Sequence, residues 1–111
     1  MAGWMADFGE YTPMNAKTGF DGRWWGPEYP EILHNILPQD WASLNREALE
    51  EAGKLGDVLF WMRSGGHGSR FHQVMNWAGD QTVDWTFSDG LPSSITAALS
   101  LAVSGMGLSH R

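Results

Sequence analysis

The segment Asp57-Val-Leu-Phe-Trp-Met-Arg63 carries the clearest strand signal in the chain. Its run of consecutive apolar residues predicts a strand that is buried on both faces, as strands are in a parallel sheet. A shorter apolar run, Ala2 to Ala6, predicts an earlier strand, and Met106 to His110 predicts the beginning of a later one. We therefore expect a sheet of about three strands with the 57–63 segment at its centre.

A helix is predicted on either side of this central strand. Residues 36–52 carry apolar side chains at helical spacing, which places them on one face: Leu37, Trp41, Leu44 and Ala48. Pro38 fits the first turn of this helix, and Gly53 fits its end. Residues 91–104 predict a second helix whose apolar face holds Leu91, Ile95, Ala98 and Ala102.

Two long segments without a period connect these elements. Residues 8–35 are rich in Pro and Gly and predict a loop, which is uncommon at this length unless it serves a site. Residues 64–90 begin with a Gly-rich stretch and continue as irregular chain. The alternation predicts an α/β fold with parallel strands, namely a partial (β/α)8 TIM barrel with about three strands and two helices. Since three strands cannot close such a barrel, we expect residues 1–111 to be the central part of a larger catalytic barrel.

The composition excludes several classes of protein. The chain has 111 residues with 7 Lys+Arg against 13 Asp+Glu, and its formal net charge of −6 disfavours nucleic acid and anionic membranes as partners. It has no Cys, which excludes a disulfide scaffold and cysteine catalysis. No apolar run reaches the roughly 18 residues of a membrane span. The N-terminus lacks the layout of a signal peptide, so we expect a cytoplasmic protein.

Tryptophan and glycine are both abundant, with 7 Trp and 14 Gly in the chain. Flat rings stack on the apolar faces of sugars, and glycines let loops turn tightly around them, so these counts are typical of a sugar-binding cleft. A Trp-rich core with mobile loops explains the same counts. Composition alone does not separate the two explanations.

Two acidic residues lie where a barrel enzyme places its chemistry. Asp7 follows the first strand, and Asp80 follows the central strand and its Gly-rich loop. Carboxylates from neighbouring strand ends form the pair that glycoside hydrolysis requires. Taken alone, each is better explained as part of a turn or a solvated acidic loop. Arg63 ends the central strand and could either donate to sugar hydroxyls or form a salt bridge with a loop acid.

Other kinds of site fit the sequence less well. His67 and His72 lack a third ligand at metal-binding spacing, so we predict neither a metal site nor a cofactor. The stretch from Gly65 to Ser69 lacks the Lys-Ser/Thr ending of a phosphate loop. A Ser-His-Asp triad would need a Gly-x-Ser-x-Gly elbow, and the sequence contains none.

Four ordered blocks together resemble glycoside hydrolase family 31, whose members are retaining α-glycosidases built on a (β/α)8 barrel. Trp4-Met-Ala-Asp-Phe-Gly-Glu-Tyr11 is similar to the nucleophile motif, and Met62-Arg-Ser-Gly65 is similar to the arginine strand. Trp77-Ala-Gly-Asp-Gln81 is similar to the acid/base motif, and the 91–104 helix followed by Gly107-Leu-Ser-His110 completes the pattern. The resemblance spans essentially the whole chain, and the residues of the motifs are most similar to those of the bacterial sulfoquinovosidases in the family.

The resemblance implies a role for each motif residue. Asp7 would be the nucleophile that forms a glycosyl-enzyme intermediate, and Asp80 would be the general acid and then the general base. Arg63 and Trp77 would line the subsite for the cleaved sugar. The further substrate-binding candidates are Trp4, Glu10 and His110.

The expected activity is therefore hydrolysis of terminal α-glycosidic bonds, with sulfoquinovose released from an α-sulfoquinovoside as the carbohydrate substrate. An α-glucosidase or α-xylosidase would use the same two acids, and a non-catalytic sugar-binding or inactive fragment is the third possibility. The resemblance implies that the sulfonate is held by residues outside this segment. We expect the 111 residues alone to be inactive, because about three strands leave open sheet edges and half a pocket.

Overall fold

The computed structural model describes residues 2–13 and 30–110. Within these ranges the chain forms four short parallel strands, two α-helices and one 3₁₀ turn. The strands are β1 (Gly3–Met5), β2 (Leu59–Met62), β3 (Met75–Trp77) and β4 (Leu108–His110); the helices are α1 (Pro30–Glu51) and α2 (Leu91–Val103), and the 3₁₀ turn is η1 (Ser69–Phe71). Neither α-helix is long and apolar enough to cross a membrane.

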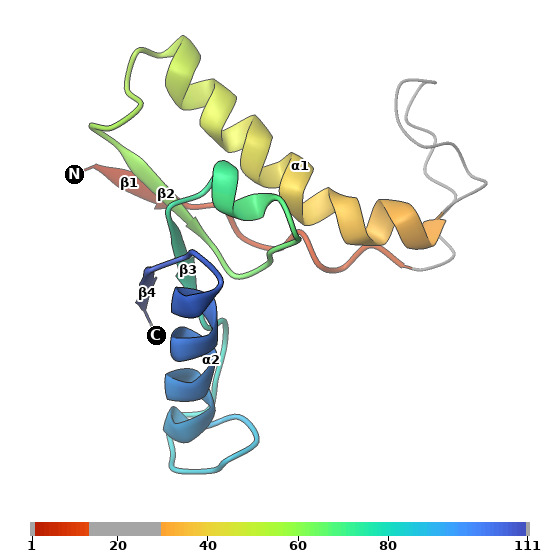
Figure 1. Ribbon diagram of the computed structural model, residues 1–111, viewed down its shortest axis with the longest axis vertical. Coiled ribbons are helices and arrows are strands. Elements are labelled where there is room, and N and C mark those ends of the chain that lie inside the picture. The colour runs from red at the N-terminus through yellow and green to blue at the C-terminus, as the bar shows by residue number, and fades with distance from the viewer. Residues whose placement is uncertain (1, 14–29, 111) are drawn as a thin grey trace.

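The strands lie side by side in chain order, β1-β2-β3-β4, and each neighbouring pair is parallel. The predicted α/β fold with parallel strands is confirmed. In Figure 1, α1 runs alongside β1 and β2, whereas α2 lies next to β3 and β4. The two helices therefore cover different parts of the sheet.

Strand β3 lies in a segment that was predicted to be irregular, so the sequence underestimates the number of strands. Met75 and Asn76 pair with Trp61 and Met62 of β2, and β4 pairs on the other side. Three residues are too few to show a period. The strand exists because its backbone finds hydrogen-bonding partners on both sides, which is information from distant parts of the chain.

The connection between β2 and β3 also departs from the predicted repeat, because it contains η1 instead of an α-helix. It is held by buried side chains. Ser69 is fully buried, and its hydroxyl accepts a hydrogen bond from the Gly66 N–H at 2.8 Å. The side-chain amide of Gln73 donates to Asn76 at 3.0 Å. These polar contacts replace the packing that a crossover helix would provide.

Helix α1 begins at Pro30, which is earlier than the predicted start at residue 36. The predicted 8–35 loop falls mostly on residues 14–29, which lie outside the described residues. Pro38 therefore lies inside the helix, and its predicted place in the first turn is wrong. A proline at an interior position has no N–H to donate, so one hydrogen bond of the helix is missing there.

The packed face of α1 is rotated by one residue from the prediction, whereas the predicted face of α2 is right at two of its four positions. The buried positions of α1 are Leu33, Pro38, Ala42, Asn45 and Leu49, whereas Leu44 and Ala48 are exposed. On α2 the buried residue is Ser94; the predicted residues Leu91 and Ala98 are half-buried, and Ile95 and Ala102 are exposed. Three of these buried residues, Ala42, Asn45 and Ser94, are small or polar. A hydrophobic period does not count such residues as core.

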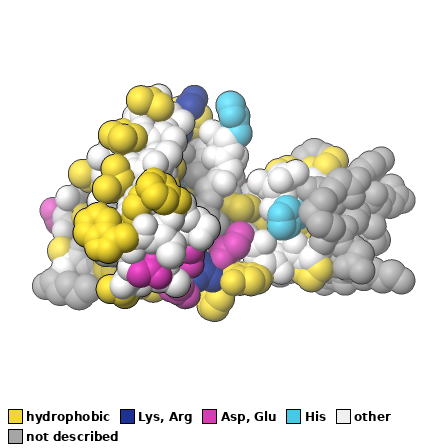
Figure 2. Space-filling view, turned by 90° about the horizontal axis from the view of Figure 1, so that it is seen from below, with side chains coloured by type: hydrophobic (Ala, Val, Ile, Leu, Met, Phe, Trp, Pro, Cys, Tyr) yellow, Lys and Arg dark blue, Asp and Glu magenta, His cyan; other side chains and the backbone are white. Residues whose placement is uncertain are grey.

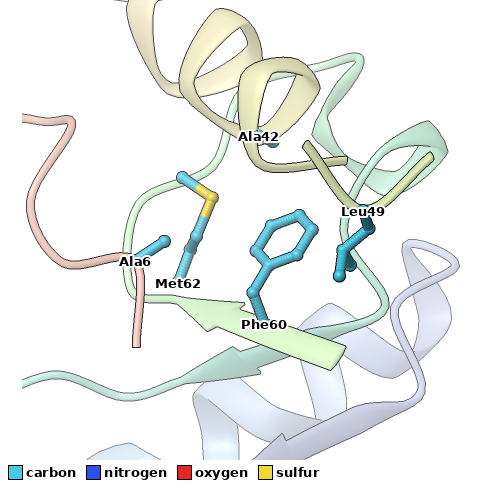
Figure 3. Close-up of a cluster of buried hydrophobic side chains, with 5 residues drawn as sticks. All are labelled: Ala6, Ala42, Leu49, Phe60 and Met62. Atoms are coloured by element: carbon cyan, nitrogen blue, oxygen red, sulfur yellow. The ribbon is translucent and has the colours of Figure 1, made fainter. Parts of the chain in front are cut away.

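The hydrophobic core lies between α1 and the first two strands. Its members point toward one another from the two layers, as Figure 3 shows: Ala6, Ala42, Leu49, Phe60 and Met62. Trp4 packs against this cluster, with its ring stacked on Phe60 at a centroid distance of 6.1 Å. The core fixes β1 and β2 beneath α1, and so it fixes where these strands end.

The α2 side of the molecule has little comparable packing. Helix α2 contains no charged residue, yet Ile95, Leu99 and Val103 are exposed by 52%, 66% and 89%. Figure 2 views the molecule toward this end and shows hydrophobic side chains gathered on its surface. A helix without charged residues that exposes large apolar side chains is typical of a position that is covered by further chain.

Candidate active site

The strand register brings the ends of the first three strands together on one face. Met5 pairs with Trp61, and Trp61 pairs with Met75. Because side chains alternate along a strand, the residues two positions further share this face: Asp7, Arg63 and Trp77. The opposite face carries Phe60 and Met62, which pack beneath α1. We call the face with Asp7, Arg63 and Trp77 the open face.

Arg63 is the hub of the polar groups at this edge. Its Nε atom lies 2.7 Å from Glu10 Oε1 and 3.4 Å from Asp7 Oδ1, and its Nη1 atom lies 3.2 Å from Asp80 Oδ2. The Arg63 side chain is only 12% exposed. Both predicted catalytic acids therefore contact one guanidinium, and the salt-bridge explanation of Arg63 holds in this structure.

Three aromatic rings surround the same guanidinium. The Arg63 Cζ atom lies 4.9 Å from the ring centroid of Phe8, 5.4 Å from that of Tyr11 and 6.0 Å from that of Trp77. Trp77 is buried, whereas Phe8 and Tyr11 are exposed. Rings around a cation provide flat apolar surfaces beside hydrogen-bonding groups, which is the combination that sugars bind.

The charge on Arg63 is secured by its neighbours. Burial lowers the pKa of the guanidinium. The hydrogen bond and charge of Glu10, followed by the charge of Asp7, raise this pKa by more than burial lowers it, so the pKa lies above its ordinary value. The guanidinium therefore remains positive across the physiological range. It offsets part of the negative charge of the three surrounding carboxylates.

Asp7 is held by several hydrogen bonds at the end of β1. Its main-chain carbonyl accepts from the Trp41 indole at 3.1 Å, and its Oδ1 atom accepts from the Phe8 N–H at 2.7 Å. Ala6, the preceding residue, donates its N–H to the Trp61 carbonyl at 2.9 Å. The Asp7 side chain is 37% exposed, so its carboxylate is held in place but remains accessible.

Asp80 follows β3 by three residues, and its side chain is 88% exposed. The chain turns at Gly79, whose φ is 86°. The loop beyond is closed locally: Asp84 Oδ1 accepts from the Thr82 hydroxyl and from the Thr86 N–H, and the Leu91 N–H at the start of α2 donates to the Asp84 carbonyl. Asp80 therefore follows a strand end directly, like Asp7, and no Gly-rich loop of β2 separates it from the sheet edge.

The other predicted site residues are placed unequally. His110 pairs with Trp77 across β3 and β4, so it shares the open face, and its ring contacts Trp61 at 5.9 Å. Glu10 binds Arg63. Trp4 is not brought to this cluster: its indole donates to Asn45 Oδ1 at 2.9 Å on the side of the sheet covered by α1.

A hollow lies next to the cluster, between the end of β2, η1 and α2. Of the described site residues it takes in Arg63 and Trp77, together with His67 and Arg70 from the β2–β3 connection. Asp7 and Asp80 stand on the open edge of the sheet beside it. In the described part of the chain, no three His, Cys, Asp or Glu side chains are arranged to hold a metal ion.

Parallel strands alternating with helices, with acids and an arginine at the carboxyl edge, define a βα-barrel architecture with a polar site at its usual place. The sequence matches the model of the glycosyl hydrolases family 31 TIM-barrel domain over residues 1–110. The chain therefore belongs to glycoside hydrolase family 31 and forms part of its TIM barrel.

The similar proteins are sulfoquinovosidases. The chain is 54% identical over 110 residues to the sulfoquinovosidase of Escherichia coli (strain K12), covering 97% of this chain and 15% of that protein. It is 40% identical over 112 residues to the sulfoquinovosidase of Agrobacterium fabrum (strain C58), covering 99% of this chain and 16% of that protein.

A solved structure agrees with these relatives. It is a family 31 sulfoquinovosidase from E. rectale in complex with an aza-sugar inhibitor, with a TM-score of 0.87 and 49% identity. The match covers 99% of this chain and 16% of that one. The chain thus spans about one-sixth of the length of the relatives that it matches, and the predicted family and fold are confirmed.

The sequence did not identify four residues that shape this site. Phe8 and Tyr11 lie within the first motif, and their rings flank Arg63. Trp41 belongs to the predicted apolar helix face and Ser64 to the arginine-strand motif, but neither pattern indicates a contact with the turn after Asp7. The contacts of Trp41 and Ser64 join positions 34 and 56 residues apart, and no local pattern encodes such pairs.

Proposed function

We propose that residues 1–111 are the central part of the catalytic barrel of a longer α-glycosidase. The observation that carries the proposal is the pair of acids, Asp7 and Asp80, which reach the same guanidinium from two strand ends. A module that only binds sugar does not need two carboxylates at neighbouring strand ends. Membership of family 31 supports the same conclusion.

In the proposed reaction, an Asp7 carboxylate oxygen attacks the anomeric carbon while Asp80 gives its proton to the glycosidic oxygen. The bond from the anomeric carbon to the leaving oxygen breaks, and a covalent glycosyl-enzyme forms on Asp7. Asp80, now ionised, takes a proton from water, and the oxygen of this water attacks the anomeric carbon and releases Asp7. Two displacements retain the anomeric configuration.

The surroundings of the acids fit this division of roles. A nucleophile needs a fixed position for in-line attack, and Asp7 has its main chain and its carboxylate hydrogen-bonded. A general acid that later works as a base must reach both the leaving group and water, and Asp80 is 88% exposed. Arg63, Trp77 and His110 are proposed to line the subsite of the cleaved sugar, and Glu10 holds Arg63. Trp4 faces away from the site, so its position supports a role in packing beneath α1 and not in binding the substrate.

The proposed substrates are α-sulfoquinovosides, from which the enzyme releases sulfoquinovose. The support is the name shared by the relatives at 54% and 40% identity and by the solved neighbour. Within family 31 the sulfonate is expected to be bound by residues outside this segment. The preference for one sugar over another is therefore tested with the complete protein.

The test compares two substrates on the full-length protein: nitrophenyl α-sulfoquinovoside and nitrophenyl α-glucoside. We expect a higher kcat/KM for the sulfonated sugar, with the α-anomer as the first product in an NMR time course. A preference for the glucoside would make the protein an α-glucosidase that uses the same acids. Activity on neither sugar, or the β-anomer as first product, would overturn the proposal. The 111-residue chain alone is expected to be inactive in the same assay.

A further inference from the structure

The turn that follows Asp7 has an unfavourable backbone conformation. Phe8 has a φ of 64°, which lies in the left-handed region that residues with a Cβ atom rarely adopt, and it is the one non-glycine residue of the described chain that does so. Gly9 follows with a φ of 103°. Such a conformation persists only where the surrounding structure holds it in place.

Two side chains from other elements hold this turn. The Trp41 indole of α1 donates to the Asp7 carbonyl at 3.1 Å, and the Ser64 hydroxyl at the end of β2 donates to the Phe8 carbonyl at 2.7 Å. Ser64 is only 5% exposed. The carbonyl of Asp7 therefore accepts a hydrogen bond from the helix, and the next carbonyl, that of Phe8, accepts one from the end of the neighbouring strand.

The same two side chains also enclose the turn sterically. A Cβ atom at Gly9 would collide with the Ser64 hydroxyl and would lie 3.5 Å from Cδ1 of Trp41. Trp41 is itself anchored, because its carbonyl accepts from the Asn45 amide at 2.8 Å, and Asn45 accepts from Trp4 at 2.9 Å. Helix α1 thus holds β1 at its middle residue, Trp4, and also holds the turn that follows it.

The turn conformation aims the Asp7 carboxylate. The N–H of Phe8 donates to Oδ1 of Asp7 at 2.7 Å, and the same oxygen lies 3.4 Å from Nε of Arg63. The Phe8 N–H and the Asp7 carbonyl belong to one planar peptide group, so a rotation of this group away from Trp41 would turn the N–H away and the carboxylate would lose this hydrogen bond.

We propose that Trp41 and Ser64 are positioning residues that lock the Asp7–Gly9 turn and thereby hold the Asp7 carboxylate in line for attack. The inference rests on the proposed function, in which Asp7 is the nucleophile. Neither residue touches the reacting atoms. Their effect is on the rate of the first displacement, because a nucleophile displaced by about 1 Å can lose about 100-fold in rate.

The test uses the full-length protein with Trp41→Phe, Ser64→Ala and the double variant. Trp41→Phe keeps a ring and removes the indole donor; Ser64→Cys, a same-size variant with a weak donor, is included in case Ser64→Ala does not fold. Ser43→Ala is the matched control, since that exposed hydroxyl on α1 binds only Glu47 in the described structure. The measurements are kcat, KM, the melting temperature and the rate of covalent labelling of Asp7 by a fluorinated glycosyl fluoride.

We expect each single variant to lower kcat and the labelling rate by about tenfold and the double variant by about 100-fold, with KM changed less than about threefold. The melting temperature of Trp41→Phe should stay above the assay temperature, so the loss of kcat should not result from unfolding. An unchanged kcat in folded Trp41→Phe and in Ser64→Cys would overturn the inference. A loss confined to KM would overturn it as well.

A structural readout separates this inference from the proposed function. If the wild-type protein cleaves no α-glycoside, the proposed function fails, and a crystal structure of the double variant still tests the lock. A displaced or multiply ordered Asp7–Gly9 turn in that structure supports it, and an unchanged turn overturns it.

Discussion

The β1–α1 and β3–α2 parts of the sheet present their acids in opposite ways. On the first, α1 packs over a buried core, and Asp7 is fixed by hydrogen bonds from Trp41 and Phe8. On the second, α2 buries only Ser94, and Asp80 stands 88% exposed with a contact to Arg63. The same supersecondary unit thus holds one acid rigidly and leaves the other open.

The difference separates two requirements of the proposed reaction. A covalent nucleophile gains from being fixed, so its strand end is packed and hydrogen-bonded. A proton-transfer residue must serve a leaving group and then a water, so an accessible loop suits it. The first part also contains the partners that fix it, whereas α2 carries apolar side chains for which the described residues provide no cover.

The largest expected effect is on Asp7. Asp7→Asn in the full-length protein should lower kcat/KM by at least about 10⁴-fold, because the amide cannot form the glycosyl-enzyme. Asp57→Asn, a change in an exposed residue before β2, is the control and should leave activity unchanged. Steady-state kinetics with nitrophenyl substrates provide the measurement, and a loss below tenfold would remove Asp7 from its role.

The loss of activity caused by Asp80→Asn should depend on the leaving group of the substrate. With an alkyl aglycone, kcat/KM should fall by about 10² to 10⁴-fold, because that oxygen needs a proton to depart. With a nitrophenyl aglycone the fall should be much smaller, and added azide should restore kcat because azide attacks without a base. Equal losses on both substrates, without azide rescue, would contradict the assignment of Asp80 as acid/base.

Two matched truncations test whether the helices differ in the complete protein. Leu49→Ala on α1 should cost about 2–5 kcal/mol of unfolding free energy, since Leu49 is 4% exposed. Leu99→Ala on α2 should cost about 2 kcal/mol, because an uncharged helix of this kind is expected to be buried in a complete barrel. Urea titration of the full-length variants measures both. A cost below about 0.5 kcal/mol for Leu99→Ala would show that α2 remains exposed.

The smallest expected effect concerns Asp40, on the side of α1 near η1. Burial raises the pKa of its carboxyl, and the charge of His72 lowers it in part. The folded state therefore binds this proton more tightly than the unfolded chain, so stability is lost as pH rises from the ordinary value of 3.8 through the folded pKa.

Asp40→Asn should consequently stabilise the protein slightly at pH 7, within about 0.5 kcal/mol, and should make no difference near pH 3. Thermal melts of the variant and the wild type at the two pH values test the sign. A variant that is less stable at pH 7 would mean that the contact with His72 outweighs the cost of burial.

The sequence alone determined the class of fold, the helix at 91–104 and the motifs that contain Asp7, Arg63 and Asp80. These features are local: hydrophobic runs, helix-stopping glycines and ordered motif blocks are written in consecutive residues. The buried face of α1 differs from the prediction by one residue, and the buried position of α2 is Ser94, because a hydrophobic period gives little weight to small or polar residues such as Ala42, Asn45 and Ser94.

Only the tertiary structure decided the rest. Strand β3 exists through its pairing with β2 and β4, and the four charges of the site meet because the strand register places Asp7, Arg63 and Trp77 on one face. Trp41 and Ser64 reach the Asp7–Gly9 turn across 34 and 56 residues. Such contacts depend on how separate segments pack, and no periodicity within any one segment records them.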